Sequence, residues 1–346
     1  MKAAESPIRT TVPAEGARAF ALSYLLALAV GGLSVIVLFG VALVSLDSVG
    51  RLPPPQLANT LCIDEKLRFL RASSSFDAPS YRPTVLAVGS SVSWRTFDGE
   101  AVEQATAGRG VPFNGGFCAL KMSETAFTTR YFLEHYPSVR DVVTILAPQD
   151  MTDCRNARAE IFDPHDVDRY VYGDAWVFPL YLKYFDPVSF VKNIFRVRNA
   201  FRWGFAFDRY GGLPIDTKEI HARLIYGALE AYDAECFAAL RGLANELKID
   251  GRRLVVATMP LHPAWLERYD PQHRHVSQFE QRIDDALAGT GAVHWRPKGF
   301  TLQRDDFVDA IHIRWSAAQA FSRALVEDTR LGQPRIESTP TAAAVR

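Results

Sequence analysis

The first hydrophobic pattern along the chain is a long run without a charged side chain. Residues Ala19 to Leu46 contain no Asp, Glu, Lys or Arg, and Arg18 and Asp47 bound the run. A helix needs about 20 apolar residues to cross the hydrocarbon core of a bilayer, whereas the apolar part of a signal peptide has about 7–15. The run is longer, and no small-x-small cleavage site follows it, so we predict an uncleaved transmembrane helix over residues 19–46.

Beyond this run, short β-branched and aliphatic segments alternate with helical patterns. The predicted strands are 84–88, 111–114, 139–146, 253–259 and 292–295. Helical periodicity is visible over 59–72, 122–135, 218–247 and 277–288. Such alternation is typical of a parallel sheet with helices on both faces. The sequence therefore predicts an α/β protein, with a three-layer α/β/α domain over residues 84–330 behind one transmembrane helix.

The segments that flank this domain are of a different composition. Leu52-Pro53-Pro54-Pro55 favours extended polyproline II geometry, so we expect 47–83 to be a stalk that holds the domain off the bilayer. Residues 331–346 become rich in Pro, Thr and Ala without a period and are predicted to be a disordered tail.

A segment within the domain, 161–213, is unusually rich in aromatic and basic side chains. This mixture suits a membrane interface, a glycan-binding cleft or a docking face. The alternative is an ordinary lid packed on the sheet, because aromatic residues are normally drawn into cores. The aromatic members include Tyr170, Tyr172, Trp176, Phe178, Tyr181, Tyr184, Phe185, Phe201, Trp203 and Phe207, and the basic members include Lys192, Arg196, Arg198, Arg202 and Arg209.

Charge and cysteine content narrow the choice of partner and compartment. The formal net charge is zero over 346 residues, which disfavours nucleic acid as a partner. Lys2, Arg9 and Arg18 precede the apolar run, so we expect a cytoplasmic N-terminus over 1–18 and the domain on the other, periplasmic side of the inner membrane.

An extracytoplasmic compartment would permit disulfides among the four cysteines, Cys62, Cys118, Cys154 and Cys236. The sequence does not give the pairing. Cys118 and Cys154 follow neighbouring predicted strands and are therefore candidates to approach one another, while any unpaired cysteine would be a small buried hydrophobe.

The candidate chemistry lies at two distant points of the chain. Ser91 follows the predicted strand 84–88 through a Gly-Ser turn, at the edge where open α/β sheets place their active sites. Asp309 and His312, three residues apart, supply the other two parts of a nucleophile, base and orienting group. The alternative for this pair is a helix-capping Asp followed by an incidental His. We predict that Ser91, Asp309 and His312 are catalytic.

This arrangement resembles the SGNH (GDSL-like) hydrolase and acyltransferase superfamily. Gly89-Ser90-Ser91 stands where the family has Gly-Asp-Ser, whose last residue is the nucleophile. Asp309-x-x-His312 precedes a helical pattern over 315–325, as expected of the family's catalytic His and its closing helix. The resemblance covers about 84–325 in block order and implies an SGNH, flavodoxin-like domain with a serine-dependent acyl-transfer site.

Two further blocks depart from the family pattern. Asn114 matches the family's Asn, but Ala119 stands where a Gly gives a backbone N–H to the oxyanion. Gln149 stands where an Asn side chain completes the oxyanion hole. Ala keeps the N–H but tolerates positive φ less well than Gly, and Gln carries the same amide donor on a longer arm. The resemblance thus implies an oxyanion hole formed by Ser91, Ala119 and Gln149.

Three other residues are candidates for the substrate pocket. Asn114 and Gly116 belong to the second block, and His262 follows the strand 253–259 at the catalytic edge. His273 and His275 lack a fixed spacing or a nearby pair of cysteines, so we expect no metal site. Acyl transfer through a serine needs no metal or organic cofactor, and we expect none.

A membrane-tethered SGNH domain is similar to the alginate-type and peptidoglycan-type O-acetyltransferases and to the D-alanyl lipoteichoic acid transfer protein. These act on glycans of the cell envelope, often beside a multispanning membrane protein that donates the acyl group. The resemblance implies an O-acyltransferase, with acetyl transfer to an envelope polysaccharide as the expected reaction. The alternatives are an esterase of acylated glycans, and a non-catalytic module that keeps the fold for glycan binding or docking.

Overall fold

The computed structural model describes residues 14–73, 76, 81–173, 176–197, 206–214, 227–229, 231–297 and 300–333. Most of the predicted cytoplasmic segment 1–18 and of the predicted tail 331–346 lies outside the described residues. The same holds for part of the aromatic and basic segment, including Arg198 and Arg202.

A five-stranded parallel sheet forms the centre of the domain. Its strands are β1 (Val85–Val88), β2 (Pro112–Asn114), β3 (Asp141–Leu146), β4 (Arg253–Thr258) and β5 (Val293–Trp295). The order is β2-β1-β3-β4-β5, and all neighbouring pairs are parallel. Every strand lies within one of the predicted runs, so the prediction of an α/β domain with a parallel sheet is confirmed.

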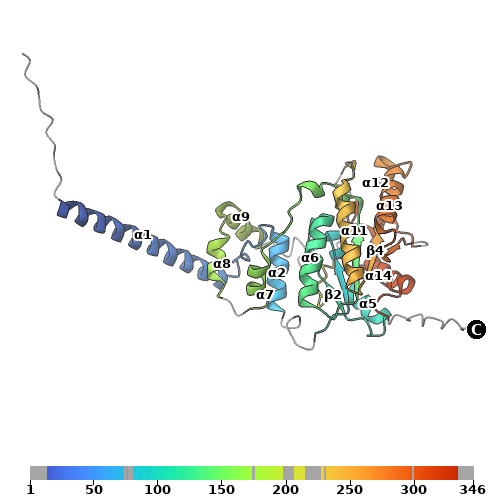
Figure 1. Ribbon diagram of the computed structural model, residues 1–346, viewed down its shortest axis with the longest axis horizontal. Helices are drawn as coiled ribbons and strands as arrows, with labels where there is room; N and C mark the ends of the chain where they lie inside the picture. Colours follow the sequence, from blue (N-terminus) through green and yellow to red (C-terminus); the bar gives the residue numbers. More distant parts are fainter. Residues whose placement is uncertain are drawn as a thin grey trace, which may run out of the picture.

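Helices cover both faces of this sheet and make it a three-layer domain (Figure 1). Alternate strand residues face opposite cores: Leu86 and Val142 belong to one, Val85 and Val143 to the other. The first core is completed by α2 (Leu61–Ala72), α6 (Met122–His135), α11 (Ala234–Ile249) and α13 (Arg274–Leu287). The second is completed by α4 (Ser91–Thr96), α5 (Gly99–Ala105), α12 (Pro263–Tyr269) and α14 (Trp315–Thr329).

The predicted helix over 218–247 is shorter than expected where the structure describes it. Residues 227–229 and 231–233 are not helical, and α11 begins at Ala234. The Asp233 side chain accepts a hydrogen bond from the Glu235 N–H at 3.0 Å and caps the helix. This cap stops the helix from extending toward the N-terminus.

Helix α1 (Ala14–Ser48) projects away from the domain (Figure 1). The stretch of 31 residues from Arg18 to Ser48 is long and apolar enough to cross a membrane, and nearly all of its residues are exposed. The C-terminal end of α1 packs against α8 (Phe178–Lys183) and α9 (Pro187–Val197) through Leu43, Tyr181 and Phe190. The apolar run therefore forms one continuous helix, as predicted, and its last turns contact the domain.

The described residues of 161–213 contact three different parts of the molecule: α2, α1 and β2. Helix α7 (Pro164–Val171) packs on α2, and α8 and α9 pack on α1. The Tyr210 carbonyl accepts a hydrogen bond from the Asn114 N–H at 2.8 Å, beyond the edge strand β2. These residues extend the side of the domain next to α2 and β2.

The proline-rich segment is packed where an isolated stalk was expected. Residues 53–58 are buried. The Tyr181 hydroxyl donates to the Pro53 carbonyl at 2.7 Å, and the Asp186 N–H donates to Gln56 Oε1 at 3.0 Å. Residues of α8 and of the segment just before α9 pack on this stretch, so the chain passes from α1 into the domain without a free linker.

All four cysteines are paired, as Cys62–Cys118 and Cys154–Cys236. The expected approach of Cys118 to Cys154 is therefore wrong. Each of these two loop cysteines bonds to the helix beside its own loop: Cys62 belongs to α2 and Cys236 to α11. The short 3₁₀ turn η2 (Cys154–Asn156) lies against α11, just after the turn η1 (Pro148–Met151).

Candidate active site

Ser91 lies at a tight turn between β1 and α4. Gly89 has φ of 135°, and a Cβ added there would lie 2.3 Å from Ser93 Oγ. Only glycine fits this position without displacing Ser93. Ser93 Oγ in turn donates to the Ile145 carbonyl at 2.9 Å and accepts from the Ile145 N–H at 2.8 Å, which fastens the turn to β3. The turn leaves Ser91 as the first residue of α4, at the carboxyl edge of the sheet.

The structure brings Ser91, His312 and Asp309 into one hydrogen-bonded chain. His312 Nε2 lies 2.9 Å from Ser91 Oγ, and His312 Nδ1 lies 2.7 Å from Asp309 Oδ2. Asp309 Oδ1 accepts hydrogen bonds from the backbone N–H groups of Ile311 and His312, at 3.0 and 2.9 Å. With the proton on Nδ1, Nε2 is free to accept the proton of the Ser91 hydroxyl.

The charges around this chain favour a neutral imidazole beside an ionised carboxylate. Burial opposes ionisation of Asp309, but the hydrogen bond and charge of His312 and the two backbone N–H groups outweigh it and lower the Asp309 pKa. Burial lowers the pKa of His312, the Arg95 charge lowers it further, and Asp309 only partly offsets both. A general base near pH 7 needs this protonation state.

We expect the acid limb of kcat/KM for a small soluble ester to have its midpoint below pH 6.5, the ordinary pKa of His. Neutral His312 is the active form, so activity is present above its pKa and lost as pH falls through it. Arg95→Gln should raise this midpoint, because the cation that disfavours imidazolium is gone. Arg95→Lys keeps the cation and should leave the midpoint close to that of the natural chain. A midpoint above 6.5 in the natural chain would contradict the assignment of His312 as the base.

A cavity of about 390 Å³ opens beside Ser91. Its wall combines the ends of β1 and β3 with the loops that follow β2 and η1. The lining residues are Ser90, Ser91, Ala119, Leu120, Lys121, Gln149, Asp150, Thr152, Asp153, Ala228, Leu229 and Ile311. The three residues predicted for the oxyanion hole therefore share one cavity.

Ala119 and Gln149 each have an unusual local feature in the wall of this cavity. Ala119 has φ of 56°, a left-handed conformation that costs an alanine about 1–2 kcal/mol relative to the right-handed region. The Gln149 amide atoms are shielded from solvent, and among the residues that the structure describes neither Nε2 nor Oε1 has a hydrogen-bond partner. Leaving such an amide unpaired costs about 1–3 kcal/mol, which a ligand oxygen at Nε2 would offset.

Two charged residues missed by the sequence analysis orient Gln149. Lys121 Nζ donates to the Gln149 carbonyl and to Thr152 Oγ1, both at 2.9 Å. Asp150 Oδ2 accepts the Ala147 N–H at 2.9 Å. Burial raises the pKa of Asp150 to about 6, although hydrogen bonds from Ala147 and Ser90 and the Lys121 charge oppose the rise. The signal that could have found Asp150 is its place in the same block, directly after Gln149.

The three residues expected to line the substrate pocket do not line this cavity. Asn114 is buried, its Nδ2 donates to the Trp94 and Phe97 carbonyls, and its Oδ1 accepts the Gly116 N–H. His262 Nδ1 accepts the Ala264 N–H at 3.0 Å and caps α12. The difference arises because these polar groups satisfy nearby backbone and so turn away from the cavity. Their contacts position the loops that carry the site.

Gly116 belongs to this supporting set for a steric reason. A Cβ at this residue would lie 2.8 Å from the Cα of Trp94, so the loop after β2 packs directly on the backbone of α4. Among the described residues, no three His, Cys, Asp or Glu side chains are grouped to hold a metal ion.

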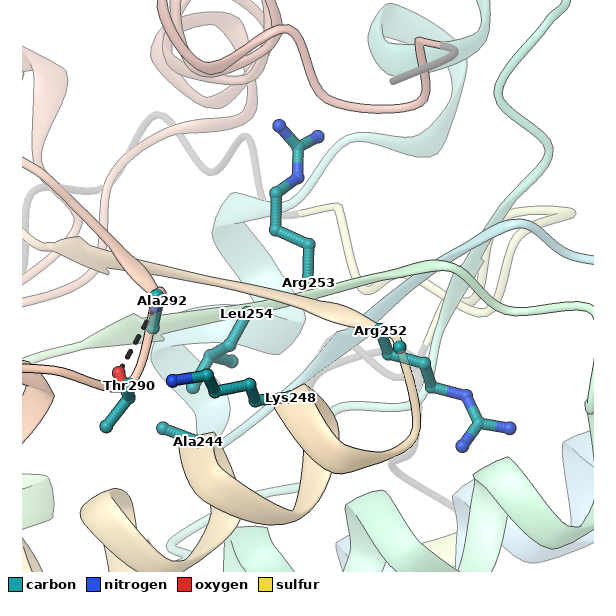
Figure 2. Close-up of a pocket in the computed structure, with 9 residues that line it drawn as sticks. Ala244, Lys248, Arg252, Arg253, Leu254, Thr290 and Ala292 are labelled. Atoms are coloured by element: carbon teal, nitrogen blue, oxygen red, sulfur yellow. Dashed lines mark hydrogen bonds between the residues drawn. The ribbon is translucent and has the colours of Figure 1, made fainter. Parts of the chain in front are cut away.

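A second cavity, of about 250 Å³, lies at the opposite, amino-terminal edge of the sheet (Figure 2). It is lined by Lys248, Arg252 and Arg253, but these cations do not converge: Figure 2 shows the two guanidinium groups pointing away from each other. Arg253 Nε donates to Asp141 at 2.7 Å, Arg252 to Asp250 at 2.5 Å, and Lys248 to the Gly289 carbonyl at 2.9 Å. The three cations therefore hold together the segments that meet at this edge of the sheet.

Comparison with known proteins adds little to this geometry. No protein-family model matches the chain, and no curated protein matches it in sequence. Among solved structures, the chain is similar to a carbohydrate acetylesterase family member from Sinorhizobium meliloti, with 12% identity and a TM-score of 0.36. The match covers 72% of this chain and 98% of that chain. A likeness of this degree carries no functional argument.

Proposed function

We propose that the protein is a serine-dependent acyl-ester enzyme of the SGNH type, anchored to a membrane by α1. The observation that carries the proposal is the hydrogen-bonded chain from Asp309 through His312 to Ser91. It ends in a cavity beside the Gln149 amide, which has no partner in the described part of the chain. A helix-capping Asp with an incidental His would not account for both distances.

In the proposed first half-reaction, Ser91 Oγ attacks the acyl carbonyl while His312 Nε2 takes the hydroxyl proton. The tetrahedral intermediate collapses, the bond to the leaving alcohol breaks, and imidazolium returns the proton to that alcohol. Asp309 holds the imidazole and stabilises its cationic form. In the second half-reaction an acceptor hydroxyl loses its proton to His312 and attacks the acyl carbon. The bond from that carbon to Ser91 Oγ breaks, and the imidazolium returns the proton to Ser91 Oγ, which restores the free enzyme.

The oxyanion formed in each half-reaction would face Ala119 and Gln149. The backbone N–H groups of Ser91 and Ala119 and the Gln149 Nε2 are the candidate donors, and one good donor contributes about 3 kcal/mol in a transition state. Lys121 and η1 fix the start of the Gln149 side chain before substrate arrives. Such preorganisation is what makes the donor effective.

The acceptor we propose is a hydroxyl of an extracytoplasmic envelope glycan, with acetyl as the acyl group. The SGNH resemblance supports a carbohydrate ester, and the two disulfides support an oxidising compartment outside the cytoplasm. A multispanning membrane protein would supply the acyl group. Water in place of the sugar hydroxyl would make the same site an esterase.

The test is to trap the acyl-enzyme. After brief incubation with an activated acetyl ester, intact-mass measurement should show one added acetyl group, and peptide mapping should place it on Ser91. Addition of candidate glycans should then transfer the acetyl group to sugar faster than water removes it. Acetylation of another residue, with Ser91 unmodified, would overturn the proposed mechanism.

We also predict that the C-terminus lies outside the cytoplasm. The basic residues Lys2, Arg9 and Arg18 precede the apolar helix, and such residues stay on the cytoplasmic side. A phosphatase reporter fused after Arg346 should be active, and a reporter that works only in the cytoplasm should be inactive at the same position. The opposite pattern would reverse the topology, and release of a soluble chain beginning after Leu46 would show a cleaved signal.

A further inference from the structure

Helices α8 and α9, together with Trp176, form a helical hairpin over 176–197 whose outer surface is apolar. Val188, Val191 and Phe195 of α9 are exposed and spaced by three and four residues, so they lie on one face of the helix. Trp176 and Val188 expose 73% and 76% of their surface. Large apolar side chains that are exposed together on one helix face are typical of a surface that contacts a partner or a membrane.

The other face of the hairpin packs on the end of α1. The Phe39 ring lies 4.9 Å from the Phe185 ring and 6.3 Å from the Phe190 ring, measured between centroids. Leu43 of α1 is buried with Phe190 in the same small core. The hairpin therefore packs directly on the C-terminal part of the proposed membrane helix, and Figure 1 shows both at the same end of the domain.

The length of α1 determines where along the bilayer normal the contact between α1 and the hairpin lies. Its 31 span residues rise about 1.5 Å each, or about 46 Å, whereas the hydrocarbon core is about 30 Å thick. If Arg18 marks the cytoplasmic boundary, about ten residues at the C-terminal end pass beyond the hydrocarbon. Contact with the hairpin starts at Phe39, which is the beginning of that part.

We propose that the hairpin 176–197 lies in the outer headgroup region of the bilayer, with Trp176, Val188, Val191 and Phe195 in contact with acyl chains. Lys192 and Arg196 of α9 would then meet the lipid phosphates while their stems pass the apolar layer. The proposal rests on α1 being a membrane span. The occupant is lipid because the apolar surface begins where the span leaves the hydrocarbon.

The hairpin is also fastened to the catalytic domain. The Tyr184 hydroxyl donates to Asp166 of α7 at 2.5 Å, and Lys183 makes an ion pair with the same carboxylate. Arg71 of α2 then donates to the Tyr170 carbonyl of α7 at 2.5 Å. Contact of the hairpin with lipid would therefore give the domain a second attachment to the membrane besides α1.

Site-directed fluorescence on the full chain tests this proposal. All four cysteines are in disulfides, so an introduced cysteine is the one thiol available for an environment-sensitive label. The test positions are Val191 and Phe195, Ile249 of α11 is the exposed control at 85%, and Val35 of α1 is the control for the span. Each variant is reconstituted in phosphatidylcholine and phosphatidylglycerol vesicles, and quenching by iodide and by nitroxide-labelled lipids is measured.

We expect iodide to quench labels at Val191 and Phe195 at least about threefold less than the label at Ile249, and nitroxide lipids to quench them. Iodide access equal to that at Ile249, with Val35 protected, would overturn the proposal and leave the span intact. Iodide access at Val35 as well would overturn both the lipid contact of the hairpin and the membrane span of α1. Protection that grows with the protein-to-lipid ratio would show a second copy on this surface, and protection only in native membranes would show a protein partner. Either result would overturn lipid contact.

Discussion

Replacing Ser91 by alanine should lower kcat for acyl-ester cleavage by about 10⁶-fold, and His312→Ala should do nearly the same, because a nucleophile and its base act as a unit. The double variant should lose little more than either single variant. Asp309→Asn should lose less, about 10⁴-fold, because it leaves both reacting groups in place and disturbs only the imidazole tautomer. Steady-state kinetics with an activated acetyl ester measure all four.

A matched control for Ser91 lies at the other edge of the sheet. Ser138 Oγ donates one hydrogen bond to the Pro83 carbonyl at 2.8 Å, far from the cavity. Ser138→Ala makes the same chemical change and should keep kcat within about twofold while costing about 1 kcal/mol of stability. Full activity of Ser91→Ala at unchanged melting temperature would remove Ser91 as the nucleophile.

Gln149→Met should lower kcat by about 10²–10³-fold with little change in KM, because the amide donor is needed mainly when negative charge develops on the carbonyl oxygen. Methionine keeps a side chain of similar length without the N–H donor. Gln149→Glu should lose as much or more, since a carboxylate of nearly the same shape would repel the oxyanion. Stability should rise or stay constant in the Met variant, because an unpaired buried amide is removed.

Retention of kcat in the Gln149 variants would contradict the proposed role of this amide. Normal turnover in both variants would show that this amide does not contact the oxyanion and that the backbone donors suffice. A rise in KM with kcat unchanged would instead mean that Gln149 binds the ground state of the substrate.

The sheet could be predicted from local patterns, whereas the contact between Ser91 and His312, which are 221 residues apart, was predicted from the sheet edge and the block order of the family resemblance. Buried parallel strands read as continuous aliphatic runs, and the carboxyl ends of such strands meet at one edge. Ser91 follows β1 directly, so its position followed from the run at 84–88. Asp309 and His312 could be assigned from their spacing and from the helix that follows them.

Features that depend on packing between distant segments could not be predicted in the same way. The disulfide partners of Cys118 and Cys154 belong to helices far away in sequence, and strand order says nothing about which helix covers each loop. Asn114 and His262 were expected in the cavity because Asn114 belongs to the second family block and His262 follows the strand 253–259 at the catalytic edge. The backbone groups that take up their hydrogen-bonding capacity become visible only in the folded chain.

The burial of residues 53–58 has a consequence for where the proposed chemistry takes place. A flexible linker over 47–83 would allow the domain an excursion of about 35 Å from its anchor. With the segment packed between α8 and the domain, the distance of Ser91 from the membrane is set by folded structure alone. A polymer would then be acylated only where it lies at that distance from the membrane. The acylation pattern along a growing glycan would therefore depend on how long each stretch stays at that distance.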